Sequence, residues 1–410
     1  MALLLSRDQF EMPYTRSLQR TATGGSVRKK PAGSPRPKNG PGFYNFIAIL
    51  FFLPCAVSSQ SLGPTSLRHT HFYEGVPITE FKSPSVKIEL KTGKYSPDPP
   101  AIFEGVPYCA TDSGKVVSIN LLSDNNANDH QIEDIRISHS YYSGGTIFGP
   151  PLVTNRLVVF GSSANYLAAF DRVSAKLLWK FRTKAPIKSS PAYTNGLIYF
   201  GCDDGYLYTL DTLGKIKWKV DLKGPVASPA YDNGVIYVGT QKSLIVALDA
   251  LTGKELWRTN SGGRAPCLGD SILYILNQNG VIVALDKQSG VERWRYDDGE
   301  NIMSSAFELA LAPSSLIYTA DKKVIALDPA SGLIQWSKEL SQQICGTSMI
   351  VTDIVYVPCS DFHLYGLDLS RGLTLTQADI GFAPYGSPAY SDGKIFYPSK
   401  KVLHILSPVQ

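Results

Sequence analysis

The sequence predicts an all-β fold, an eight-bladed β-propeller whose blades are four-stranded antiparallel sheets. The first observation is a unit that recurs about every forty residues, which is typical of radial or stacked repeats. The second is that each unit consists of short segments rich in Val, Ile and Tyr, separated by Asn-Gly, Asp-Gly or Thr-Gly turns. The third is an N-terminal segment that resembles the strand missing from the last unit.

Residues 225–260 contain one complete unit. We expect an inner strand around Ala227–Tyr231, followed by Val235–Gly239, Leu244–Asp249 and an outer strand at Glu255–Arg258. The turn before the second strand contains Gly234, because a residue that reverses the chain there needs a positive φ. Four strands of this length cannot bury both faces of their sheet, so neighbouring units must pack face to face around an axis.

An aspartate and a tryptophan mark the repeat. The aspartates are Asp171, Asp211, Asp249, Asp286, Asp328 and Asp368. The tryptophans are Trp179, Trp218, Trp257, Trp294 and Trp336. An aspartate at the end of the third strand is expected to bond the N–H groups of the next turn, with catalysis as the alternative. A tryptophan on the outer strand is expected to dock on the neighbouring blade and to bond a backbone carbonyl, with stacking on sugars or bases as the alternative.

Two weaker copies extend the count to eight. One lies upstream, at residues 101–120, with Asn120 in the place of the aspartate. The other lies at 386–406, and the chain given ends before this copy has an outer strand. Such a blade would expose an open sheet edge. We therefore predict that residues 85–91 pair with 402–406 and close the ring.

The chain before the propeller has a different composition. Residues 1–41 form a basic leader, rich in Pro, Gly, Ser and Arg, which we expect to be disordered. Residues 42–59 form a signal-peptide core or signal anchor, 60–84 a linker, and 85–410 the propeller. The net charge of +5 is concentrated in the leader. The rest of the chain is close to neutral, which argues against nucleic acid as a partner.

The apolar segment at residues 46–57 follows basic residues and precedes small ones. A bilayer-spanning helix needs about 20 apolar residues, so twelve fit the core of a signal peptide better. We favour cleavage near Ser58 or Ser59, and an uncleaved segment would anchor the chain in a membrane. Either alternative predicts a propeller on the lumenal or extracellular side, at the cell surface or secreted.

Five cysteines lie in the predicted propeller. Cys345 and Cys359 fall on the first two strands of one blade, and a disulfide between them is a hypothesis that depends on their register. The other three, Cys109, Cys202 and Cys267, are expected to be buried thiols.

No sequence motif indicates catalysis. The chain lacks the phosphate-binding, esterase and zinc-protease motifs, and its six histidines are not spaced as metal ligands. We expect no catalytic, cofactor or metal residues. The longest interruption, Leu121–Tyr142, is expected to be a loop, either a connector or a binding loop.

Exposed aromatic residues are the candidates for a partner surface. They are Tyr141, Tyr142, Phe382 and Tyr385, and ordinary strand packing is the alternative for all of them.

The unit Ala-x-Asp-x-x-Thr-Gly-x-x-x-Trp, present at Val246–Trp257 and with Ser for Thr at Val283–Trp294, resembles the tryptophan-docking repeat of the pyrroloquinoline-quinone-repeat propellers. The resemblance covers residues 86–410. It implies the eight-bladed fold of the quinoprotein alcohol dehydrogenases and of the outer-membrane assembly lipoproteins. In the dehydrogenases it implies a Cys-Cys disulfide, a Ca²⁺ site and an aspartate base, but this chain has no Cys-Cys pair.

The basic leader, apolar segment and propeller also resemble the layout of plant gamete-expressed membrane proteins, which act in pollen-tube guidance. Those proteins have a membrane span near the C-terminus, which the sequence to Gln410 does not contain.

We therefore expect a non-catalytic, monomeric, extracytoplasmic propeller that binds a protein partner through its rims, without a cofactor. The alternatives are a quinone-dependent oxidoreductase and the sensor ectodomain of a longer membrane protein.

Overall fold

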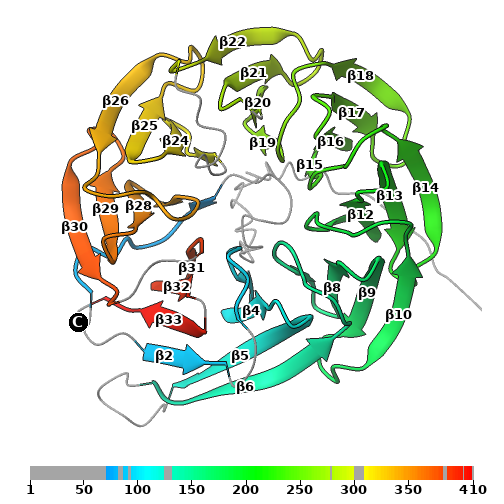
Figure 1. Cartoon of the computed structure of the whole chain (residues 1–410), viewed down its shortest axis with the longest axis horizontal. Coiled ribbons are helices and arrows are strands. Elements are labelled where there is room, and N and C mark those ends of the chain that lie inside the picture. Colours follow the sequence, from blue (N-terminus) through cyan, green and yellow to red (C-terminus); the bar gives the residue numbers. More distant parts are fainter. Residues whose placement is uncertain are drawn as a thin grey trace, which may run out of the picture. The chain divides into compact units, whose positions relative to one another are not determined.

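The computed structural model describes residues 71–81, 86–90, 94–123, 132–277, 279–299, 309–381, 386–399 and 401–408. The chain separates into two compact units, Met1–Val57 and Ser58–Gln410, and the described residues all belong to the second. They form eight small sheets arranged around one axis, with no helix among them (Figure 1). The predicted eight-bladed β-propeller is confirmed.

Each of the first four blades contains four strands, numbered outward from the centre. Blade 1 contains β3 (Ala101–Phe103), β4 (Val106–Ala110), β5 (Lys115–Ser123) and β6 (Ile132–Tyr142). Blade 2 contains β7 (Leu152–Val153), β8 (Leu157–Ser162), β9 (Tyr166–Asp171) and β10 (Leu177–Arg182). Blade 3 contains β11 (Ala192–Thr194), β12 (Leu197–Gly201), β13 (Tyr206–Asp211) and β14 (Ile216–Asp221). Blade 4 contains β15 (Ala230–Asp232), β16 (Val235–Gly239), β17 (Ile245–Asp249) and β18 (Glu255–Thr259).

Blades 5 to 8 follow in the same order. Blade 5 contains β19 (Cys267–Leu268), β20 (Ile272–Leu276), β21 (Ile282–Asp286) and β22 (Glu292–Tyr296). Blade 6 contains β23 (Ala310–Leu311), β24 (Leu316–Ala320), β25 (Lys323–Leu327) and β26 (Ile334–Glu339). Blade 7 contains β27 (Met349–Val351), β28 (Ile354–Cys359), β29 (His363–Asp368) and β30 (Thr374–Asp379). Blade 8 contains β31 (Ala389–Ser391), β32 (Lys394–Pro398) and β33 (Val402–Leu406), together with β2 (Val86–Glu89).

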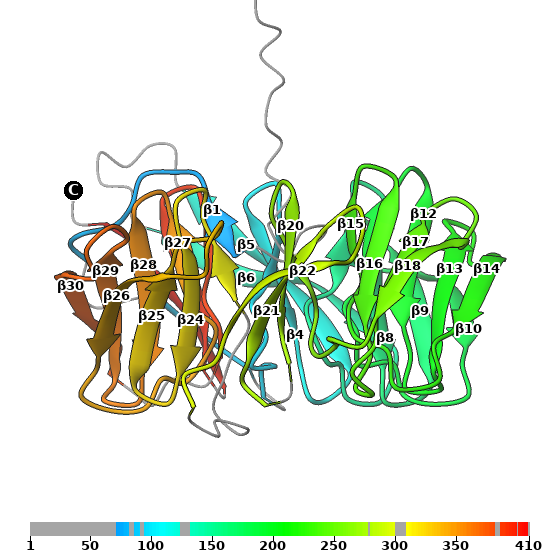
Figure 2. The ribbon, with the colours of Figure 1, turned by 90° about the horizontal axis from the view of Figure 1, so that it is seen from above.

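The strands within a blade alternate in direction, so its turns lie on two opposite faces of the ring (Figure 2). The turns after the first and third strands lie on one face, which we name the turn face. The turns after the second strand, and the connections to the next blade, lie on the opposite face, which we name the crossover face. The second and third strands are buried almost throughout. Their side chains form core clusters between neighbouring blades, as Tyr274 of blade 5 does with Leu316 of blade 6.

The N-terminal strand closes the ring as predicted. β2 pairs antiparallel with β33, with Val86 opposite Ile405 and Glu89 opposite Val402. The backbone N–H of Leu90 extends the ladder by bonding the Lys401 carbonyl at 2.8 Å. The third strand of blade 8 therefore does not remain an open edge.

The predicted linker at 60–84 is wrong over residues 71–81, which pack on blades 7 and 8. β1 (Phe72–Tyr73) adds a parallel fifth strand beside β27, and Phe81 bridges to Pro408. The reason is apolar burial, since Tyr73 and Ile78 lie in the core cluster shared by these blades. We name residues 71–81 the strap.

The predicted loop at Leu121–Tyr142 is also wrong over most of its length. β5 and β6 form one long hairpin, paired from Lys115 and Tyr142 as far as Ser123 and Ile132. Two register shifts keep the strands paired although the segment departs from the repeat. Residues 124–131 lie outside the described residues.

Candidate functional site

The five tryptophans make the same contact. Each indole N–H donates to the carbonyl of the residue that follows the repeat aspartate of the next blade. The bonds are Trp179 to Thr212 at 2.9 Å, Trp218 to Ala250 at 3.2 Å, Trp257 to Lys287 at 3.1 Å, Trp294 to Pro329 at 3.1 Å and Trp336 to Leu369 at 2.8 Å. These tryptophans therefore tie blades 2 to 7 together, with Trp336 buried and the other four half-buried.

The glycine of the repeat receives the tryptophan ring. Gly332 has a φ of +73°, and a Cβ atom built on it would lie 2.5 Å from a ring carbon of Trp294. Gly290 lies against Trp257 in the same way. Only glycine tolerates both this backbone conformation and this approach. Each sequence unit thus supplies the tryptophan that donates to the next blade. It also supplies the glycine and the carbonyl that receive the tryptophan of the preceding blade.

The six aspartates lie in six different blades and bond their own turns. Asp249 is representative, since one carboxylate oxygen accepts the Thr252 N–H at 2.8 Å and the Thr252 hydroxyl at 2.6 Å. These bonds to the Thr252 hydroxyl and N–H hold the pKa of Asp249 below its usual value. The Arg371 guanidinium and the Ser370 hydroxyl lower the pKa of Asp368 to about 2. The structure does not bring the aspartates together into one site.

The predicted aromatic surface is wrong for Tyr141 and fits the structure for Tyr142, which is 60% exposed. Tyr141 is fully buried, and its hydroxyl donates to the carbonyl of Arg172, the residue after Asp171, at 2.6 Å. It therefore replaces the docking tryptophan at the interface of blades 1 and 2. Phe382 and Tyr385 lie outside the described residues.

The predicted disulfide between Cys345 and Cys359 is not formed, and both residues are free thiols. The backbone bridge places Ile344, not Cys345, opposite Cys359. Ile344, and not Cys345, is therefore the residue paired with Cys359 across this bridge. Each thiol instead contacts a backbone carbonyl, that of Gln343 for Cys345 and that of Gln342 for Cys359. Cys109, Cys202 and Cys267 are buried thiols.

The described residues contain no cluster of three or more His, Cys, Asp or Glu side chains that could hold a metal ion. They also contain no helix long and apolar enough to cross a bilayer. The apolar segment at 46–57 lies outside the described residues.

Exposed aliphatic side chains recur on the turn after the third strand. In blades 2 to 4 this side chain lies two residues after the repeat aspartate. In blades 5 to 7 it directly follows the repeat glycine. They are Val173, Leu213, Leu251, Val291, Leu333 and Leu373, and they are between 53% and 74% exposed. We name these six residues the aliphatic rim. All lie on the turn face, and the fixed offset from the aspartate or glycine was the signal that could have identified them in the sequence.

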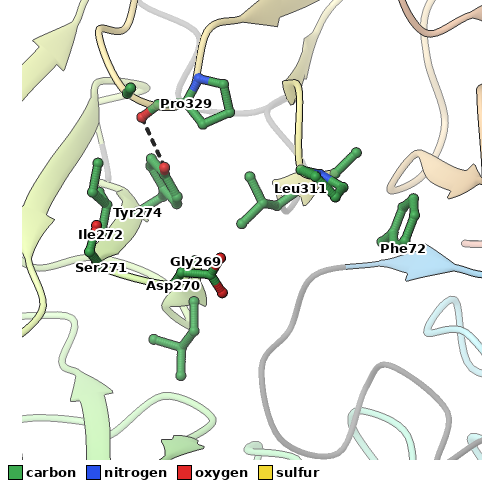
Figure 3. Close-up of a pocket in the computed structure, with 12 residues that line it drawn as sticks. Phe72, Gly269, Asp270, Ser271, Ile272, Tyr274, Leu311 and Pro329 are labelled. Carbon is green, nitrogen blue, oxygen red and sulfur yellow. Dashed lines mark hydrogen bonds between the residues drawn. The ribbon is translucent and has the colours of Figure 1, made fainter. Parts of the chain in front are cut away.

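A pocket opens on the turn face between blades 5 and 6 and has a volume of about 460 Å³ (Figure 3). The turns Gly269–Ser271 and 312–315 border it from these two blades. Leu311 and Phe72 of the strap supply further apolar surface. Asp270 is the only charged residue among the described residues that line the pocket.

The fold and its tryptophan-docked units define a PQQ-type β-propeller. A family model described as outer membrane protein assembly factor BamB (PQQ_2) matches residues 94–211, 163–263, 203–360 and 241–396. These overlapping matches span more than half of the chain, so the chain belongs to this family. None of the curated proteins compared with the sequence is a significant match.

Solved structures share the fold at low sequence identity. BamB from Moraxella catarrhalis is 17% identical, with a TM-score of 0.63 over 80% of this chain and 99% of that chain. The quinohemoprotein alcohol dehydrogenase from Comamonas testosteroni is 14% identical, with a TM-score of 0.64 over 80% of this chain and 77% of that chain. The computationally designed protein Ika8 is 15% identical, with a TM-score of 0.65 over 78% and 98%. At these identities the similarity concerns the fold alone.

Proposed function

We propose that this propeller is a non-catalytic, extracytoplasmic protein-binding module that holds its partner on the turn face. The aliphatic rim is the observation that carries the proposal, because six consecutive blades expose a large apolar side chain at equivalent turns. A partner that spans several blades of this face would cover these side chains together, and extended exposed apolar surface marks protein interaction sites. The membership of a family described by an assembly factor supports a protein partner.

Photo-crosslinking in the cell tests the proposal. A photoreactive phenylalanine analogue replaces Leu213, Leu251 or Leu333 in the full chain, and crosslinking from all three positions to one partner protein is expected. Phe362 is the matched control, since it is a 48% exposed apolar residue on the crossover face. Equal crosslinking from Phe362, or none from the rim, would contradict the proposal.

The oxidoreductase alternative has a separate test. The Ca²⁺ and quinone chemistry of the related dehydrogenases needs a cluster of acidic side chains, and the repeat aspartates are instead committed to their own turns. Addition of pyrroloquinoline quinone and Ca²⁺ is expected to change neither the visible absorption nor the melting temperature. A saturable rise in melting temperature would favour the oxidoreductase.

The resemblance in layout to plant gamete-expressed proteins extends the proposal to cell-surface recognition, as in pollen-tube guidance. The chain contains no Asn-x-Ser/Thr sequon, so N-glycosylation cannot report its passage through the secretory pathway. Chemical labelling of the surface of intact cells is therefore the suitable test. Labelling of the propeller by a membrane-impermeant reagent is expected, and protection until lysis would contradict a position at the cell surface.

A further inference from the structure

We propose that the outer wall of blades 2 and 3 binds an extended acidic segment of a partner protein, which lies along the edge strand β14. Residues 176–184 and 215–223, which contain β10 and β14, form this surface, and we name them the basic wall. The basic wall lies at the periphery of the ring, whereas the aliphatic rim lies on the turn face (Figure 1). The inference therefore goes beyond the proposed function and rests on different residues.

Positive charge is concentrated on two of the outer strands. Residues 176–184 contain four Lys or Arg and no acidic residue, for a net charge of +4, and residues 215–223 contain four Lys and one Asp, for a net charge of +3. The equivalent windows of blades 4 to 7 have net charges of +1, −1, 0 and −1. These windows are residues 254–262, 291–299, 333–341 and 373–381, aligned on the docking tryptophan or, in blade 7, on Thr376. The charge is thus a property of blades 2 and 3 and not of the repeat.

The lysines of blade 3 outnumber the carboxylates that pair with them. The ion pairs are Lys217 with Asp211 at 3.0 Å and Lys223 with Asp221 at 2.5 Å. Lys215 and Lys219 are exposed, and neither forms an ion pair with another of the described residues. Two positive charges of β14 and its entry are therefore free to attract the carboxylates of a partner.

Aromatic rings hold one of these ammonium groups in place. The Lys219 ammonium lies 4.5 Å from the ring centroid of Tyr206 and 5.9 Å from that of Tyr208. In blade 2, the Lys180 ammonium lies over the ring of Tyr166 in the same way, at 4.5 Å. Such contacts order the lysine side chain without neutralising its charge. An ordered cation loses less conformational freedom when it binds an anion.

The backbone of the basic wall is open to a further strand. β10 and β14 are the outermost strands of their sheets, and neither pairs with a further strand of the part of the chain that the structure describes. Extended peptides add to such edges through backbone hydrogen bonds. Lysines on an edge strand ordinarily prevent pairing between identical chains, because like charges repel. The same lysines favour an added strand that carries carboxylates, since opposite charges on neighbouring strands stabilise the pairing.

Apolar side chains lie among the cations. Leu177, Leu178 and Ile216 are 48%, 43% and 46% exposed. A peptide with alternating acidic and aliphatic residues places carboxylates near the lysines, apolar side chains near these residues and backbone groups along the edge of β14. A polysaccharide, a nucleic acid or a lipid surface cannot supply the row of backbone hydrogen bonds. The combination favours a protein segment as the occupant.

Fluorescence polarisation with the full chain tests the proposal. The probe is the labelled peptide Gly-Glu-Val-Glu-Val-Glu-Gly, and its first control replaces every Glu by Gln. The wild-type chain is expected to bind the probe and to bind the Gln peptide about fivefold more weakly, and added salt is expected to weaken probe binding. Equal binding of the two peptides would overturn the proposal.

Two methylated peptides test strand addition separately from charge. One carries N-methyl groups on every valine and the other on every glutamate, so each lacks the backbone donors of one edge. An added strand bonds β14 through one edge only, and one of the two peptides is therefore expected to bind about fivefold more weakly than the probe. Unchanged binding of both would overturn the placement along β14.

Protein variants localise the binding. Lys215→Glu and Lys219→Glu reverse one charge each and are expected to weaken probe binding about fivefold, as the loss of an exposed ion pair does. Lys254→Glu is the matched control, because Lys254 is exposed and occupies the position of Lys215 in the nearly neutral window of blade 4. Unchanged affinity in both wall variants would overturn the proposal, as would an equal loss in the control.

Light scattering tests the alternative that the lysines only protect the edge from self-association. Wall variants that aggregate, but whose monomers bind the probe like the wild-type chain, would show that the lysines have this protective role alone. Heparin and vesicles that contain phosphatidylserine test the other polyanions. If either binds the wild-type chain and not the wall variants while the peptide does not bind, the occupant is a polysaccharide or a lipid surface and the proposal is wrong.

Rim crosslinking distinguishes this inference from the proposed function. Rim crosslinks in a chain that does not bind the probe would retain the turn face as a partner site and reject the basic wall. Probe binding that is lost in the wall variants, without crosslinks from the rim, would retain the basic wall and reject the turn face.

Discussion

Two regions of the ring are stabilised by different side chains. The first comprises the successive interfaces from blade 2 to blade 7. The second is the seam, where the N-terminal strap packs on blades 7 and 8. In the first region every interface uses a tryptophan, a glycine and a carbonyl at fixed positions of the repeat. At the seam, tyrosines of blades 7 and 8 bond the backbone of the strap. The Tyr356 hydroxyl accepts the Ile78 N–H at 2.6 Å and donates to the Ile78 carbonyl at 2.8 Å, and Tyr390 donates to the Val76 carbonyl at 2.8 Å.

The difference teaches how the ring is stabilised. The tryptophan contacts join residues of adjacent units, whereas the seam contacts join residues separated by 278 and 314 positions. Closing so long a loop costs more chain entropy than closing one unit. We therefore expect the seam to be the less stable region, and the variants below test this comparison.

The largest effect is expected from Ile88→Asp in β2. Ile88 is 7% exposed and lies in the core cluster of blades 8 and 1, so an aspartate there buries an unpaired charge. The free energy of unfolding should fall by about 3–5 kcal/mol. Lys87→Ser, at the exposed neighbouring position, is the control. Thermal melting measures both, and an unchanged midpoint for Ile88→Asp would refute closure by β2.

A pair of glycine variants tests the tryptophan interfaces. Gly332→Ala and Gly234→Ala both place a Cβ at positive φ, which costs about 1–2 kcal/mol. Only Gly332 faces a tryptophan, and the clash with Trp294 should add about 1–3 kcal/mol. Denaturant unfolding measures the difference. Equal losses would show that the ring does not depend on this contact.

The Pro329 carbonyl of blade 6 accepts two hydrogen bonds, so the stability losses from removing its two donors should not be additive. Trp294 and Tyr274 both donate to the Pro329 carbonyl, at 3.1 and 2.9 Å. Tyr274→Phe alone should cost about 1 kcal/mol, because the carbonyl keeps a donor. Adding Trp294→Phe should cost about 1 kcal/mol more than the sum of the single variants, since the carbonyl is then unpaired. A double-mutant cycle measures the coupling, and strict additivity would exclude the shared bond.

The pH dependence of stability should separate the seam from the tryptophan interfaces. His404 of blade 8 is buried beside Ser399 and opposite Lys87, and burial, followed by the Lys87 charge, lowers its pKa to about 3. The unfolded chain then binds the proton first, so this contribution to stability is present above the ordinary histidine pKa of about 6.5 and is lost as the pH falls toward 3. Asp368 also has a depressed pKa, and its contribution to stability is lost only below about pH 4, where the aspartate of the unfolded chain becomes protonated.

Unfolding midpoints from pH 7.5 to 2.5 measure this separation. His404→Gln is expected to flatten the dependence between about pH 6.5 and 4, and Asp368→Asn only below about pH 4. If His404→Gln leaves the upper range unchanged, the seam does not titrate through this residue.

The repeat made most of the fold predictable from the sequence, because each unit carries its own turn and docking residues. The closing strand was predictable for the same reason, since the segment around Ile88 matches an outer strand. The strap was not, because Tyr356 and Ile78 are far apart in the chain and no local pattern relates them. Tyr141 was assigned to the surface because its role depends on the next blade, through Arg172.

The candidate site was less predictable than the fold. Exposed aromatics were expected to form the partner surface, but the recurring exposed residues on the turn face are aliphatic. The pocket combines Phe72 with residues some 200 positions later, Leu268 and Asp270 among them, so only the closed ring creates it.

Hydrogen exchange of the wild-type chain at β33 tests ring closure most directly. The amides of Leu403 and Ile405 belong to a strand that is paired on both sides, by β32 and by β2. Residues 402–406 should exchange slowly, and they should lose this protection in Ile88→Asp while residues 245–249 of blade 4 keep theirs. Fast exchange of 402–406 in the wild-type chain would contradict a propeller closed by its N-terminal strand.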